Sequence, residues 1–188
     1  EWSLIIDRIY SDLITVKETW DTLSDKLFNL LPERSDAAAG EAGQLVIRLL
    51  PGNKPKNWEE LAALESGMVT TLSDTLRSGE RMLNEMRDQE GQSSSDSLVT
   101  DIGGLFKDLA VIRDNVRFFM GLNDQNVVYW LEANGNYRSK SLQLYAVPVD
   151  VSSQLKELFF DKKKSIILTS ATLSVDKSFQ FMIDNLGL

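Results

Sequence analysis

A group of small hydroxyl side chains directly after an apolar run is the segment of this chain best suited to chemistry. Residues 165–168 predict a buried strand, and Thr169, Ser170, Ala171 and Thr172 follow it. Open α/β sheets place their ligand-handling loops at the carboxyl ends of strands, where such hydroxyls can form hydrogen bonds. The alternative interpretation is that these hydroxyls only satisfy backbone groups of their own loop.

Two sets of basic residues are spaced so that each lies on one helix. The sets are Lys107, Arg113 and Arg117 in one predicted helix and Arg77, Arg81 and Arg87 in another. Cations in such positions can track the phosphates of a nucleic-acid strand, and we treat the first three with Arg77 and Arg81 as candidate contacts. The alternative is a solvated helix face on which acidic neighbours balance the charge.

The composition excludes several kinds of chemistry. The 188 residues include no Cys and no His, which removes disulfides, thiol nucleophiles and every mechanism that needs an imidazole. No phosphate-cradling Gly-rich motif ending in Lys-Ser/Thr occurs, and neither does a Gly-x-Gly-x-x-Gly or Gly-x-Ser-x-Gly motif. We therefore expect no catalytic residue, no metal site and no bound cofactor within these residues.

The formal net charge of −8 makes the chain a poor general binder of nucleic acid, because Lys and Arg supply most non-specific affinity for phosphates. Any contact with DNA would therefore need a local basic patch. No apolar run of about 18 residues is present, so no membrane span is predicted. The lack of Cys is compatible with a cytoplasmic location, which we expect.

Three apolar stripes at helical spacing predict three long helices. The first runs from Trp2 to Leu31 and should end before Pro32, the second begins after Asn57, and the third runs from about Asp96 to Gly121. The stripe of the first is Ile6, Ile9, Leu13, Val16, Trp20, Leu23, Leu27 and Leu30, and that of the third is Leu98, Ile102, Leu105, Leu109, Ile112, Val116 and Phe119. Such stripes bury best against one another, which predicts an antiparallel bundle.

The pattern changes near residue 123. Residues 127–131 and 141–147 are rich in β-branched and aromatic side chains and flank an Asn-Gly turn, which predicts a hairpin. Another short strand is predicted at residues 44–50, and a final helix from about Lys177. The fold class is therefore mainly α with a smaller α/β part, divided into a helical domain at 1–122 and a second domain at 123–188.

The hydroxyl segment and its surroundings resemble a known family. Residues 169–174, Thr-Ser-Ala-Thr-Leu-Ser, resemble motif III of superfamily-2 helicases. The flanking Val-Tyr-Trp-Leu from Val128 and Tyr-Ala-Val-Pro-Val-Asp-Val from Tyr145 are similar to the DinG/XPD branch. The resemblance covers residues 123–188 by pattern and residues 1–122 by architecture only, since that family inserts a helical arch ahead of motif III.

The resemblance implies a fragment of an ATP-dependent DNA helicase with a role in DNA repair. In that family the arch helps to enclose single-stranded DNA, and motif III, here Thr169 to Thr172, couples ATP hydrolysis to strand movement. ATP and Mg²⁺ would bind to the full-length parent through residues outside this chain, so the fragment alone should be inactive. Some bacterial DinG proteins also carry a 3'-5' exonuclease domain, and the resemblance inclines us towards such a parent.

Two other hypotheses remain open from the sequence. The bundle could be a helical module that binds another protein through an exposed apolar groove, which an additional apolar patch on its surface would favour. The heptad spacing also suits a coiled-coil oligomer. Three stripes in one chain can satisfy each other, however, so we expect a monomer.

Overall fold

The computed structural model describes residues 2–33, 38–39, 44–89, 96–136, 139–170, 174 and 178–188. The chain divides into two compact units, which are described separately. The helical unit comprises Glu1–Asn123 and Tyr129–Tyr145, and the carboxyl-terminal unit comprises Asp124–Val128 and Ala146–Leu188.

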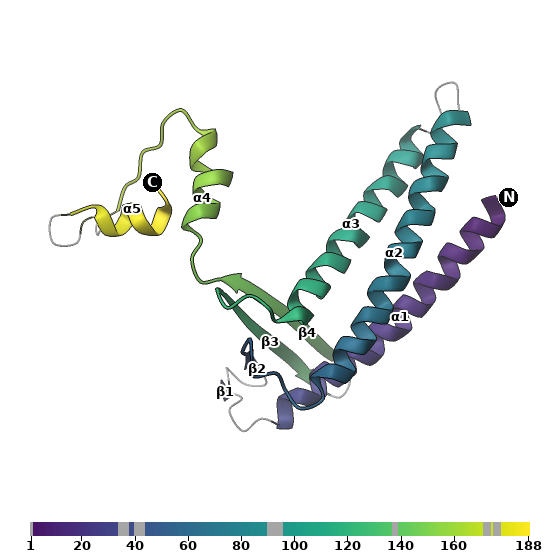
Figure 1. Cartoon of the computed structure of the whole chain (residues 1–188), viewed down its shortest axis with the longest axis horizontal. Helices are drawn as coiled ribbons and strands as arrows, with labels where there is room; N and C mark the ends of the chain where they lie inside the picture. The colour runs from purple at the N-terminus through teal and green to yellow at the C-terminus, as the bar shows by residue number, and fades with distance from the viewer. Residues whose placement is uncertain are drawn as a thin grey trace. The chain divides into compact units, whose positions relative to one another are not determined.

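Three long helices form the body of the helical unit, as the apolar stripes predicted. They are α1 (Trp2–Glu33), α2 (Trp58–Gln89) and α3 (Asp96–Gly121). Consecutive helices run antiparallel, and α2 lies between α1 and α3 and packs against both (Figure 1). The predicted antiparallel bundle is confirmed.

The core of the helical unit is densest where the carboxyl-terminal half of α1, the first half of α2 and the end of α3 come together. The buried side chains there include Leu23 and Leu27 from α1, Trp58, Leu61, Met68 and Leu72 from α2, and Val116, Phe119 and Met120 from α3. The Trp58 indole N–H donates to the Met120 carbonyl oxygen at 3.0 Å, which ties the start of α2 to the end of α3. Trp20, which the stripe placed in the core, is only half-buried.

The apolar stripe predicted for α3 does not face α2 along its whole length. Leu98, Leu105 and Ile112 are 54%, 64% and 54% exposed, whereas Val99 is 4% exposed. The packed surface keeps Val116 and Phe119 of the predicted stripe. Nearer the start of α3 the covered positions lie one residue later than predicted, at Val99 and Phe106. The physical reason is that α3 packs extensively against one long helix only, so a single stripe of its surface can be covered.

A four-stranded sheet has the order β1-β2-β3-β4, from β1 (Ala38–Ala39), β2 (Gln44–Leu49), β3 (Val127–Asn136) and β4 (Ser139–Pro148). The antiparallel β2–β3 register aligns Ile47 with Leu131 and Leu49 with Tyr129. Alternate residues of β3, including Tyr129, Leu131 and Ala133, are buried because successive side chains point to opposite faces of a sheet. The predicted short strand and the predicted hairpin are confirmed, but the predicted turn at Asn134 and Gly135 is wrong. Both residues belong to β3, where Asn134 pairs with Gln44 of β2.

Most of the hairpin belongs to the helical unit, which the sequence did not predict. The sequence pattern predicts that all of residues 123–188 belong to a second domain, whereas Tyr129–Tyr145 lies in the helical unit. The reason is strand pairing: β2, which lies between α1 and α2 in the chain, is the partner of β3. The assignment of the two domains to parts of a helicase stays a prediction.

The carboxyl-terminal unit contains α4 (Ser152–Leu158), the 3₁₀ turn η1 (Phe160–Lys162) and α5 (Gln180–Leu186). Helix α4 packs against α5, yet none of the three elements has a buried residue. Gly187 ends α5 in the left-handed conformation with φ 72°, and a Cβ there would collide with the Ser152 carbonyl oxygen. Gly187 therefore allows the close contact between the two helices.

One predicted element of this unit is wrong. Residues 165–168 do not form a strand, and Ile167 and Leu168 are 90% and 41% exposed. A strand is held by hydrogen bonds to a neighbour, and no strand among the described residues pairs with this segment. None of the helices that the structure describes is both long enough and apolar enough to cross a membrane.

Candidate nucleic-acid interface

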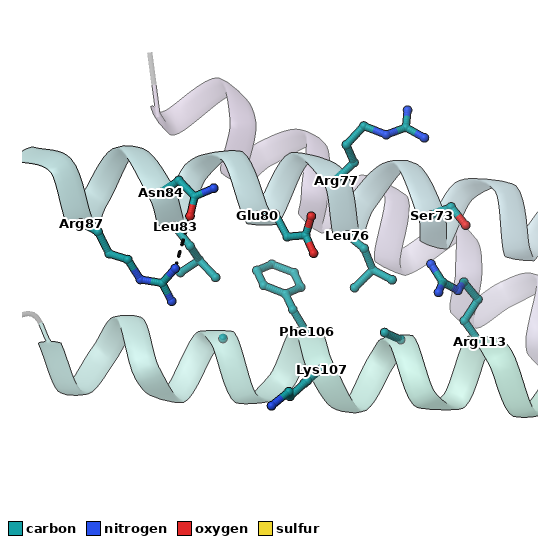
Figure 2. Close-up of a pocket in the computed structure, with 12 residues that line it drawn as sticks. Ser73, Leu76, Arg77, Glu80, Leu83, Asn84, Arg87, Phe106, Lys107 and Arg113 are labelled. Carbon is teal, nitrogen blue, oxygen red and sulfur yellow. Dashed lines mark hydrogen bonds between the residues drawn. The ribbon is translucent and has the colours of Figure 1, made fainter.

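A groove of about 670 Å³ lies between α2 and α3 in the helical unit (Figure 2). Its lining residues are Ser73, Leu76, Arg77, Glu80, Leu83, Asn84 and Arg87 from α2 and Gly103, Phe106, Lys107, Ala110 and Arg113 from α3. Within each helix these residues recur at intervals of three and four, which places them on one face. The groove is thus the seam along which the two helices face each other.

Basic side chains from both helices meet in this groove. Arg77 and Arg87 come from α2, and Lys107 and Arg113 come from α3. Three of these four belong to the five candidate contacts predicted from the sequence, and Arg87 belongs to the same basic set as Arg77. The groove also contains one carboxylate, Glu80. The structure therefore concentrates positive charge locally on a chain whose net charge is −8.

The centre of the groove is aromatic. The half-buried Phe106 ring lies against the backbone of α2 at Gly79, where any Cβ would overlap the ring. Figure 2 shows the ring between the two helices, with Arg87 towards one end of the groove and Arg113 towards the other. A glycine inside α2 is the feature that lets the ring approach so closely.

Hydrogen bonds hold three of the four cations in place. Arg77 Nη1 donates to Asp74 Oδ1 at 3.1 Å, and Arg87 Nη1 donates to Asn84 Oδ1 at 3.2 Å. The third bond, from Arg113 Nε to Asp114 Oδ1, is 2.8 Å long.

The Arg113–Asp114 pair also shifts the titration of both groups. The hydrogen bond raises the pKa of Arg113, with a smaller contribution from Glu80, and lowers the pKa of Asp114. Both groups therefore stay charged at physiological pH. Lys107 makes no ion pair within the described part of the chain, so its ammonium group faces solvent.

The other two predicted contacts, Arg81 and Arg117, are exposed and do not line the groove. Arg117 acts instead on Glu65 of α2, a carboxyl group that is only 9% exposed. Burial raises the pKa of Glu65, and the positive charge of Arg117 offsets part of this rise. Glu65 Oε1 has no hydrogen-bond partner among the described residues.

The hydroxyl segment of the carboxyl-terminal unit is described only in part. Thr169 and Ser170 are exposed and outside any helix or strand, while Ala171 and Thr172 lie outside the described residues. Within the described ranges, no group of three or more acidic side chains is arranged to hold a metal ion. Thr169 and Ser170 therefore do not follow a strand in the described part of the chain.

Comparison with known proteins gives one informative match. No protein-family model matches the chain. Over 72 residues it is 42% identical to the 3'-5' exonuclease DinG of Bacillus subtilis (strain 168). This chain contains a DinG-related region. The match covers 38% of the chain and 8% of DinG, so the chain spans only a small part of that relative.

Sequence reasoning missed two features of the groove. It predicted the basic sets on two separate helices without predicting that they converge, and it assigned no role to Phe106. The available signals were the interior glycines, Gly79 and Gly103, since glycine within a helix often marks a close approach of another group. Neither signal says which residue approaches, and only the packing of α2 on α3 supplies that.

Proposed function

We propose that this chain is part of an ATP-dependent DNA helicase of the DinG type. The observation that carries the proposal is the 42% identity to DinG over 72 residues. The resemblance of residues 169–174 to motif III and the order of the chain, long helices first and this segment later, support the same family. The name of the relative states a 3'-5' exonuclease, and we extend that activity to the parent protein as part of the proposal.

The roles follow the two units. The helical unit acts as an arch that helps to enclose single-stranded DNA. Thr169 to Thr172 form motif III and couple ATP hydrolysis to strand movement.

We expect ATP and Mg²⁺ to bind outside the residues of this chain. The sequence has no phosphate-cradling Gly-rich motif with its Lys, and the described residues contain no acidic cluster that could hold a metal ion. Nucleotide and metal therefore bind to other residues of the parent. On its own, this chain neither hydrolyses ATP nor unwinds DNA, and we expect it to be a monomer.

The test is Thr172→Ala in the full-length protein. We expect unwinding to slow by about tenfold, equal to roughly 1.4 kcal/mol in the barrier, while DNA-stimulated ATP hydrolysis stays within about twofold. Ser165→Ala, which removes an exposed hydroxyl just ahead of the motif, is the matched control and should change neither rate. Equal retention of unwinding and hydrolysis in Thr172→Ala would contradict a coupling role.

A second candidate is a protein-interaction module, and the exposed apolar residues of α3 favour it. Leu98, Leu105 and Ile112 recur every seven residues on one side of the helix and are more than half exposed. If the partner is a second copy of this chain, bound through these heptad positions, sedimentation should show a species larger than 21.2 kDa. Leu105→Glu should reduce that species to the monomer. A monomer in both proteins would remove the coiled-coil oligomer.

A further inference from the structure

We propose that the groove between α2 and α3 binds a short run of single-stranded nucleic acid. In this proposal the side chains of Arg87, Lys107 and Arg113 bind phosphate groups of the strand. The ring of Phe106 stacks on a base. This inference rests on the proposed function and deepens it, because it names the residues of the helical unit that touch the strand. It also assigns the contacts to these three cations and excludes Arg81 and Arg117, which do not line the groove.

The first argument is charge. Four cations and one carboxylate line the groove, and the two further acidic groups at its margin, Asp74 and Asp114, are hydrogen-bonded to Arg77 and Arg113. The cations therefore outnumber the carboxylate among the groove's lining residues, which favours a polyanion there although the chain as a whole is acidic.

The second argument is the position of the two guanidinium groups relative to the ring. Arg113 lies seven residues after Phe106 on α3, and Arg87 lies seven residues after Glu80 on the antiparallel α2, each interval rising roughly 10 Å. The cations consequently flank the ring on opposite sides (Figure 2). Arg87 reaches across to α3, where its Nη2 lies 4.0 Å from the position that a Cβ on Gly103 would occupy.

The third argument is the chemistry of an aromatic ring between cations. In single-stranded nucleic acid the backbone charges and the unpaired bases are both accessible, and base–aromatic stacking tolerates any sequence. In a duplex the bases already stack on one another and do not reach Phe106. An acidic peptide would use the cations but leave the ring without a partner. Single-stranded nucleic acid is therefore the ligand that uses both features.

Glu80 is the one carboxylate among the residues that line the groove. It contributes to the raised pKa of Arg113, which places its negative charge near that guanidinium. A phosphate bound to Arg113 would be repelled by Glu80. Removing this charge should strengthen binding to the groove, an effect opposite in sign to that of removing a cation.

The experiment measures binding of the 188-residue chain to a fluorescent oligothymidylate of about 12 nucleotides by anisotropy at low salt. We expect Arg87→Gln to weaken binding about tenfold and Phe106→Leu about fivefold. Glu80→Gln should tighten it about threefold. Lys107→Gln, at an exposed position where no folding defect is expected, should weaken it about threefold and lower the salt slope by roughly 0.7.

The control is Arg8→Gln, which removes an exposed charge from α1, outside the groove. It should change the affinity by less than about twofold. Circular dichroism and thermal melting verify the fold of each variant. If Arg8→Gln weakens binding as much as Arg87→Gln and Lys107→Gln, or if the wild-type chain does not bind, the groove assignment is overturned. If Phe106→Leu has no effect and polyglutamate competes as well as the oligonucleotide, the ligand is an acidic peptide and the proposal is also overturned.

The two proposals can fail independently. If the groove variants bind the oligonucleotide like the wild type while Thr172→Ala uncouples the full-length protein, the groove proposal fails and the helicase proposal stands. If the groove variants behave as expected but the full-length protein shows no DNA-stimulated ATP hydrolysis, the helicase proposal fails and the binding site stands.

Discussion

The two units of this chain differ in how far their apolar side chains are buried. In the helical unit, Leu23, Leu27 and Tyr129 are 0% exposed, and the elements that cover them come from distant parts of the chain. In the carboxyl-terminal unit, α4, η1 and α5 bury no residue, and Ile167 is 90% exposed. Similar side chains therefore stabilise one unit and remain in solvent in the other.

The difference teaches that an apolar pattern gains free energy only where a second surface meets it. Helix α2 has neighbours on two sides, α1 and α3, so its stripes are buried. Helices α4 and α5 have seven residues each and contact mainly each other. Two short helices cannot exclude water from both of their apolar faces, so phenylalanines such as Phe179 and Phe181 stay exposed.

The largest effect that tests this comparison is expected from truncating matched aliphatic residues in the two units. Leu27→Ala should lower the free energy of unfolding by about 3 kcal/mol, because it leaves a cavity in a packed core. Ile167→Ala should change it by less than about 0.5 kcal/mol, since that side chain is already in water. Urea unfolding followed by circular dichroism measures both. Similar losses would show that the carboxyl-terminal unit has a core of its own.

The next effect concerns the contact that holds α4 to α5. Gly187→Ala should lower the hydrogen-exchange protection of the α5 amides by about tenfold, because its positive φ and the nearby Ser152 carbonyl leave no room for a Cβ. Urea unfolding of the helical unit should not change. Leu188→Ala, at the exposed neighbouring position, is the control and should leave the protection of α5 as it is. Unchanged protection in Gly187→Ala would mean that the α4–α5 contact contributes nothing.

The smallest effect concerns Glu65, which is buried in the helical unit although it can carry a charge. Because burial raises its pKa, the folded protein binds a proton more tightly than the unfolded chain does, and stability falls as pH rises through the folded-state pKa. Glu65→Gln should therefore stabilise the protein by about 1 kcal/mol at neutral pH. This gain should shrink as the pH falls and the wild-type carboxyl becomes neutral.

Thermal melting across acidic and neutral pH measures this difference for Glu65. Glu18→Gln, on the exposed side of α1, should stay within about 0.5 kcal/mol of the wild type at every pH. A Glu65→Gln variant that is less stable than the wild type at neutral pH would mean that Arg117 compensates fully for the burial of the carboxylate.

Much of the fold was predictable because its signals are local. The 3.6-residue period of the apolar stripes predicted all three long helices, and the Asn-Gly turn between β-branched runs predicted the hairpin. The same rules wrongly predicted a strand at residues 165–168. An apolar run indicates only that its side chains favour burial. Whether the run forms a strand depends on a pairing partner from another part of the chain.

The candidate site divides in the same way. The sequence predicted that Arg77 and Arg87 lie on one helix and that Lys107 and Arg113 lie on another. It could not predict that the two faces turn towards each other, because the stripe of α3 that meets α2 is not its most apolar stripe. That choice excluded Arg117 from the groove and brought Phe106 into it.

By itself, the sequence determined the helices, the hairpin, the acidic net charge and the resemblance of the segment from Thr169 to the helicase motif. Each of these depends on residues close together in the chain. Only the tertiary structure decided which face of α3 is covered and that the basic residues of two helices form one groove around Phe106. The reason is that packing optimises the total contact between whole helices, with Gly79 setting how closely the Phe106 ring approaches α2.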